Sequence, residues 1–202
     1  MDPGYYRMAE VLFQDMQNLH KMGLNGMISC QNQRVFFPTG LGMVAMAAAL
    51  WDETCSFDKV AVDYFSAAFG ADGTAVQDYL RRISDAFDPR YLRRELPVVD
   101  AAAADRLASI PALLEEFIPV IASHTEDTFL PENVRKSWEY LRYHADYCRL
   151  LAEALRVRAE GDEEGYFARR EDLYEWTRMN ELPLQTVFDM FELQEAFGLF
   201  MS

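Results

Sequence analysis

PENVRKSWEYLRYHADYCRLLAEALRVRAE, residues 131–160, is the stretch that decides the fold class. Apolar residues recur every three or four positions through it, from Trp138 past Cys148 to Leu155. That spacing is typical of a helix with one apolar face. Pro131 suits the first helical turn, because its missing N–H would have no partner there. We therefore expect one long helix over about residues 132–160.

The segments on either side show the same helical periodicity, interrupted by glycines and prolines. Gly23 and Gly161 follow periodic segments, as glycines that end helices do. The predicted fold class is mainly α, with a helical bundle from about Ser56 onward. Outside 131–160, helices are expected at about residues 5–22, 40–50, 56–68, 74–87, 100–110, 112–122 and 163–179, and from Pro183 onward.

A short N-terminal strand is the exception to this helical pattern. Residues 24–30 (LNGMISC) form an apolar run directly after Gly23, which favours a buried strand. A lone strand leaves N–H and C=O groups unpaired on both edges, so other strands would have to satisfy them. We therefore divide the chain into a helix–strand–helix segment, residues 1–55, and a helical domain, residues 56–202.

The charge balance limits the partners that the chain can bind. It has 202 residues with 19 Lys and Arg against 33 Asp and Glu, a formal net charge of −14. Nucleic acids and anionic membranes attract basic surfaces, so neither is expected as a partner. The partners that we expect are a second domain or another copy of the chain, and oligosaccharide remains open.

No motif for catalysis, for a metal or for another cofactor is apparent, and no catalytic residue is assigned. His144, Asp146 and Cys148 are close in sequence, but residues two positions apart on a helix point in different directions. Acidic pairs such as Glu115–Glu116 and the 162–164 run resemble the carboxylates of glycosidases. In an acidic helical chain, solvated faces and helix caps explain them better.

The location that the sequence favours is the cytoplasm. Three cysteines are too few and too scattered for a disulfide framework. The start has no basic and then apolar signal, and the longest apolar run, residues 43–51, is too short to span a bilayer. Export stays open if a signal precedes the printed sequence.

The loop after the expected strand is the candidate binding site. Gln31, Asn32 and Arg34 carry donors and acceptors that suit sugar hydroxyls or a carboxylate. Phe36, or Phe37 beside it, could form a flat platform for a sugar face. The competing interpretation is a polar loop that caps the next helix.

One stretch resembles a known family. Residues 15–70, DMQNLHKMGLNGMISCQNQRVFFPTGLGMVAMAAALWDETCSFDKVAVDYFSAAFG, carry GLNGMISCQ, LWD and FDKVAVDYFSAAFG, and VQDYLRRISDAF follows at 76–87. The pattern resembles the end of the barrel in an uncharacterised bacterial family of large proteins. Those proteins carry a glycoside-hydrolase-like TIM barrel, similar in style to α-glucuronidases and β-hexosaminidases. The likeness spans about residues 8–88.

The resemblance implies a role without catalysis for this chain. Residues 26–30 would be the last barrel strand, and Gln31, Asn32 and Arg34 would lie at the rim where substrates bind. The catalytic carboxylates would lie on earlier strands that this chain lacks. Some relatives have an acid near the position of Gln31, and glutamine cannot replace a general acid. The expected function is a C-terminal helical region that supports a glycoside-hydrolase-like barrel; the alternative is a stand-alone protein-interaction module.

Overall fold

The computed structural model describes residues 2–28 and 34–194, and it confirms a mainly helical fold. The helices fall close to the predicted segments. They are α1 (Tyr6–Gln17), η1 (His20–Met22), α2 (Leu41–Trp51), α3 (Phe57–Phe69), η2 (Gly70–Asp72), α4 (Gly73–Phe87), α5 (Pro89–Leu92), α6 (Ala101–Ala108), α7 (Ile110–Thr125), α8 (Glu132–Ala159) and α9 (Glu163–Leu184).

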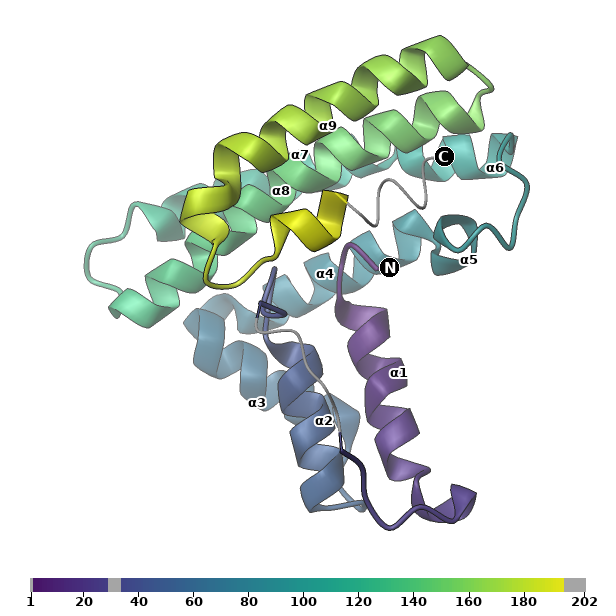
Figure 1. Cartoon of the computed structure of the whole chain (residues 1–202). Coiled ribbons are helices and arrows are strands. Elements are labelled where there is room, and N and C mark those ends of the chain that lie inside the picture. Colours follow the sequence, from purple (N-terminus) through teal and green to yellow (C-terminus); the bar gives the residue numbers. More distant parts are fainter. Residues whose placement is uncertain (1, 29–33, 195–202) are drawn as a thin grey trace.

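The predicted long helix is α8, and it forms the axis of the bundle. α6 and α7 pack along it on one side and α9 returns antiparallel to it (Figure 1). The apolar stripe read from the sequence is buried: Trp138, Leu141 and Cys148 have no exposed surface. α8 thus supplies side chains to the core along nearly its whole length.

Two helices project from this bundle as an arm. α1 and α2 lie side by side and extend away from α8, with η1 at the far end (Figure 1). Gly23 ends η1 with a φ of 77°, a left-handed conformation that glycine adopts without strain. α3 packs against α2, α4 and α8, and so connects the arm to the bundle.

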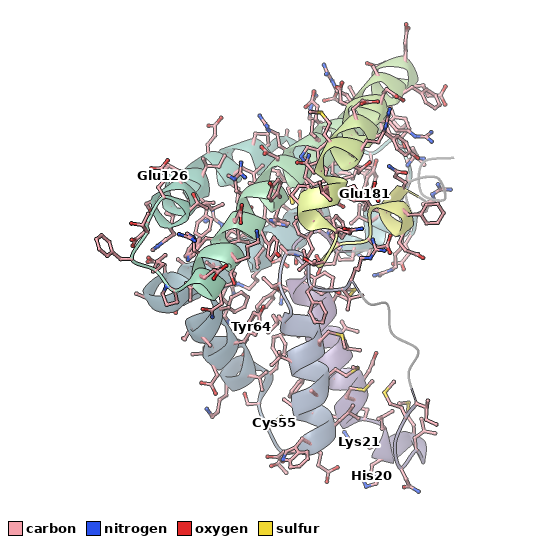
Figure 2. The ribbon with its side chains drawn as sticks, turned by 60° about the vertical axis from the view of Figure 1, so that its left-hand side comes forward. His20, Lys21, Cys55, Tyr64, Glu126 and Glu181 are labelled. Atoms are coloured by element: carbon pink, nitrogen blue, oxygen red, sulfur yellow. The ribbon has the colours of Figure 1, made fainter. Side chains whose placement is uncertain are left out.

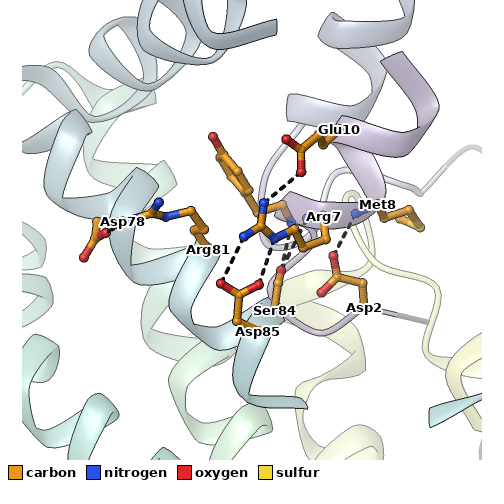
Figure 3. A network of polar contacts seen from close by, with 9 residues as sticks. Asp2, Arg7, Met8, Glu10, Asp78, Arg81, Ser84 and Asp85 are labelled. Carbon is orange, nitrogen blue, oxygen red and sulfur yellow. Dashed lines mark hydrogen bonds and ion pairs between the residues drawn. The ribbon is translucent and has the colours of Figure 1, made fainter. Parts of the chain in front are cut away.

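The root of the arm is fixed by hydrogen bonds to the first turn of α1 (Figure 3). The Ser84 Oγ of α4 accepts from the N–H groups of Tyr6, at 3.2 Å, and Arg7, at 3.5 Å. The Asp2 Oδ2 accepts from the N–H of Met8 at 2.9 Å. These acceptors satisfy N–H groups that a helix start leaves free. Arg7 also pairs with Asp85 through two nitrogens.

The predicted N-terminal strand is wrong, and the described residues give no support to a barrel remnant. Residues 24–28 run as exposed irregular chain after η1, and Ile28 is fully exposed. Within the described ranges, the β-structure is an isolated antiparallel bridge between Val35 and Phe188. Without a neighbouring strand, this short apolar run has no ladder to join. Ser29 and Cys30 lie outside the described residues.

Two helices differ from their predicted form. Residues 41–50 of α2 are apolar nearly all round and were expected to be buried on most sides, yet Val44 is 42% and Leu50 45% exposed, because α1 and α3 cover only part of the helix. A helix was expected to begin at Pro183, but α9 continues through this proline and ends at Leu184. A proline costs little so close to a helix end, because the hydrogen bond it removes belongs to the final turn.

The predicted division after residue 55 runs through a continuous apolar core. Phe57 lies against Tyr6 and Phe13 of α1, with ring centroids 5.6 and 5.5 Å apart. All three rings belong to the same buried cluster as the α8 stripe. Two units at this boundary therefore remain a prediction, and aromatic packing joins them.

Candidate functional site

A cavity of about 220 Å³ lies where the arm meets the bundle. Four segments that are distant in sequence form its wall: residues 2–8, residues 34–38, α8 and residues 188–193. We call it the Asp2 cavity, and its lining residues are Asp2, Pro3, Tyr5, Met8, Arg34, Val35, Phe37, Pro38, Tyr147, Phe188, Asp189, Glu192 and Leu193.

Three aromatic rings form one wall of the Asp2 cavity. Phe37 and Phe188 stack with ring centroids 4.4 Å apart. Tyr147 meets both rings edge to face, at 6.4 Å from Phe37 and 6.2 Å from Phe188. The Phe36 N–H donates to the Val187 carbonyl at 3.0 Å, so backbone pairing holds two of these rings together.

The acidic group of the cavity is Asp2, which is only 7% exposed. Its Oδ2 caps α1, as described above, whereas its Oδ1 is buried and has no hydrogen-bond partner in the structure. Buried polar atoms normally have a partner, since an unpaired one costs roughly 1–3 kcal/mol. Asp2 therefore has unused capacity to accept a hydrogen bond.

Charged side chains lie at the rim of the Asp2 cavity. Arg34 Nε is 3.7 Å from Asp189 Oδ2. The Oδ1 atom of Asp189 accepts from the N–H groups of Phe191 and Glu192, and so it caps the helical turn that follows. Because Arg34 is partnered by Asp189, an acidic sugar would have to compete with that carboxylate for the guanidinium.

Burial raises the pKa values of the two tyrosines that line the cavity. Burial raises the pKa of Tyr147, and the nearby Cys148 and Asp2 raise it further. Burial and Asp2 also raise the pKa of Tyr5, whose hydroxyl donates to the Val35 carbonyl at 3.4 Å. Both phenols stay protonated at neutral pH and do not act as general bases.

A buried histidine lies behind the aromatic wall. His144 Nε2 is 2.8 Å from the Pro3 carbonyl oxygen, so it carries the proton and donates. Nδ1 then accepts from the Tyr79 hydroxyl at 3.3 Å. Burial lowers the pKa of His144 to about 4 and raises that of the adjacent Cys148. This neutral pair holds the N-terminal segment against α8 and offers no thiolate nucleophile.

The structure brings one of the predicted site residues into the cavity. Arg34 lines it, whereas Phe36 is 42% exposed and does not. The neighbouring Phe37, considered as an alternative platform, is buried in the cavity wall. Gln31 and Asn32 lie outside the described residues, so their part in a site stays a prediction.

Two of the acidic residues considered as members of catalytic pairs have structural roles. Glu116 pairs with Arg82 at 2.8 Å, and Asp162 accepts from the Gly165 N–H at the start of α9. Across residues 2–28 and 34–194, no three His, Cys, Asp or Glu side chains are grouped so that they could hold a metal ion. Asp146 points away from His144 and pairs with Arg149.

Sequence reasoning missed Asp2 and Tyr147 as site residues. Tyr147 lies in the stretch that defines α8, where its spacing marks it only as a core residue. Asp2 gives no periodic signal, although an acid before Pro3-Gly4 is typical of a turn. Their convergence depends on tertiary packing between the chain start and α8.

One apolar stretch passes a simple test for a membrane span. Residues 101–125 are long and apolar enough by length and composition. The stretch contains α6 and α7, and α7 buries Ile110, Leu114, Phe117 and Ile121 in the core. Because core helices meet the same criterion, this stretch is weak evidence for a membrane.

Comparison with known proteins adds no assignment: no protein family, curated protein or solved structure matches this chain.

Proposed function

We propose that the chain is a non-catalytic helical module that docks onto a second protein domain through the far end of its arm. The observation that supports this proposal is a group of exposed apolar side chains at the far end of the arm. We call this surface the apolar end and define it as Met22, Leu24, Met27, Ile28, Leu50 and Trp51, which are between 43% and 104% exposed.

The apolar end has the composition of a docking surface. Leu24, Leu50 and Trp51 border one hollow of about 490 Å³ between η1 and the end of α2. Figure 2 shows this end of the arm, with His20, Lys21 and Cys55 labelled, standing clear of the bundle. Contiguous apolar patches are rarely left exposed on a monomer, and they mark interaction sites.

The sequence resemblance supports the kind of partner. It implies a glycoside-hydrolase-like barrel beside a helical region, and the apolar end falls within the resembling stretch. A partner domain docked at this end would cover residues 24–28, which are exposed in this chain. The alternative, a stand-alone interaction module, uses the same surface with a different partner.

Self-association of the isolated chain tests the apolar end. With its partner absent, the exposed surface should pair with a second copy, and sedimentation velocity should show a concentration-dependent dimer. The double variant Leu24→Ser/Trp51→Ser should shift the chain to monomer. Phe129→Ser is the matched control, because Phe129 is 97% exposed between α7 and α8, away from the arm. A chain that stays monomeric at all concentrations contradicts the proposal.

Catalysis is tested separately with a panel of aryl glycosides. We expect no turnover above the uncatalysed rate, since Glu116 serves as an ion-pair partner and Asp162 as a helix cap. Robust hydrolysis that a single carboxylate-to-amide substitution abolishes would overturn the non-catalytic role.

A further inference from the structure

The Asp2 cavity lies at the root of the arm, at the opposite end from the docking surface, and the proposed function does not use it. Its volume of about 220 Å³ exceeds the roughly 150 Å³ of apolar cavities that bind benzene. A molecule with one ring and a short side chain fits in this space. The cavity can therefore be considered as a ligand site in its own right.

The lining excludes several ligand classes. Pro3, Val35 and Leu193 join the three aromatic rings in a mainly apolar wall. A sugar carries many hydroxyl groups, and each would need a donor or acceptor that these side chains do not supply. A free anion would meet three acids, Asp2, Asp189 and Glu192, against one base, Arg34.

The same lining matches a cation with an apolar body. Aromatic faces attract ammonium groups through their quadrupole, most strongly where water is excluded. Phe37, Tyr147 and Phe188 line the cavity, and so does Asp2, whose Oδ1 has no hydrogen-bond partner in the structure. Asp2 is near enough to Tyr5 and Tyr147 to raise their pKa, which places its charge beside the cavity wall.

We propose that the Asp2 cavity binds a small organic ammonium ion, with the charged nitrogen near Asp2 and the apolar body against Phe37, Tyr147 and Phe188. Glu192 adds negative charge at the rim and attracts the cation as it enters. The proposal stands on the cavity alone and is independent of docking at the apolar end.

Phenethylamine and 2-phenylethanol are matched probes for this site. Both carry one ring and a two-carbon chain, but only the amine is cationic at neutral pH. Titration calorimetry on the full chain should show phenethylamine binding at least about tenfold more tightly than the alcohol, which is the size of a desolvated cation–π and charge contribution. Equal binding of the two probes would show that the cavity binds apolar molecules without recognising the charge. If neither probe binds, the cavity is not a site for this class of ligand.

Variants separate the charge from the rings. Asp2→Asn should reduce the amine preference most, and circular dichroism shows whether α1 survives the change of its cap. Glu192→Gln should weaken the amine severalfold and leave the alcohol nearly unchanged, whereas Phe188→Leu should weaken both probes, because the ring of each lies against Phe188. Glu181→Gln, an exposed acid outside the cavity, is the matched control and should change nothing. An amine preference that survives Asp2→Asn in folded protein would overturn the proposal.

Discussion

His144 is held as a neutral imidazole by its surroundings. It is fully buried between Tyr79 on α4 and the Pro3 carbonyl of the N-terminal segment. A proton added to Nδ1 would face the Tyr79 hydroxyl with no carboxylate to balance it. Burial thus lowers the pKa of His144 from 6.5 to about 4, and folding becomes linked to proton binding.

We predict that acid destabilises the chain through His144. Between pH 6.5 and about 4, His144 is protonated in the unfolded chain and neutral in the folded chain. The free energy of unfolding therefore falls as pH drops through this window. The pKa difference corresponds to about 3 kcal/mol, fully present above pH 6.5. Urea unfolding at several pH values measures it. His144→Gln should flatten the slope, and a wild-type slope in this variant contradicts the prediction.

Ser84 provides a second prediction at the residue scale. Its Oγ accepts from two N–H groups at the start of α1, and both lose their partner in Ser84→Ala. The free energy of unfolding should fall by about 1–3 kcal/mol, since buried N–H groups are costly to leave unpaired. Chemical denaturation measures the free energy of unfolding of Ser84→Ala and of the control Ser66→Ala, which changes an exposed serine on α3. Equal stability of the two variants would show that water replaces Ser84.

At the scale of elements, the close approach of α3 and α4 depends on Gly73. A Cβ at Gly73 would lie 2.6 Å from the Phe65 carbonyl carbon and 2.8 Å from the Ser66 nitrogen, both backbone atoms that cannot rotate away. We predict that Gly73→Ala forces the helices apart and lowers the unfolding free energy by about 1–3 kcal/mol, as overpacking does. Thermal denaturation measures it.

Gly26→Ala is the control for this substitution, because no atom lies within 4 Å of its Cβ position. Its melting temperature should stay near that of the unchanged chain. If Gly73→Ala melts at the same temperature as Gly26→Ala, then α3 and α4 are not in the tight contact described here.

The helices were predictable from sequence, and the site was not, for a physical reason. Most of the helices have a local sequence signal, such as the α8 stripe from Trp138 to Leu155 and the Asp100 cap that accepts from Ala102 and Ala103, but the short α5 was not predicted. The predicted strand at residues 24–30 failed because an apolar run of this length is ambiguous without knowledge of its neighbours. Leu24, Met27 and Ile28 of that run are exposed and belong to the apolar end.

The Asp2 cavity shows the same limit at a longer range. It combines residue 2 with residues 34–38, 147 and 188–193, and no local pattern links segments so far apart. Arg34 was found because it follows a polar run, and Phe37 because loop aromatics are unusual. The partnering of Arg34 by Asp189 could be learned only from the folded chain.

Two properties of the whole molecule oppose each other in the isolated chain. The apolar end favours contact with a second copy, while a net charge of −14 makes two copies repel each other. Charges on separate copies are screened over about 10 Å at 0.1 M salt and over about 3 Å at 1 M. The attraction between apolar surfaces does not depend on screening. Weaker charge repulsion at high salt therefore favours association through the apolar end.

Self-association should therefore increase with salt. We predict a larger dimer fraction at about 0.5 M sodium chloride than at about 0.02 M, because screening removes the repulsion and leaves the apolar contact intact. Sedimentation equilibrium at fixed protein concentration measures it, and Leu24→Ser/Trp51→Ser should remain monomeric at both salt levels. A dimer that dissociates as salt rises would instead be held by ion pairs. The apolar end would then not be the contact, because pairing through Leu24 and Trp51 gives the opposite dependence.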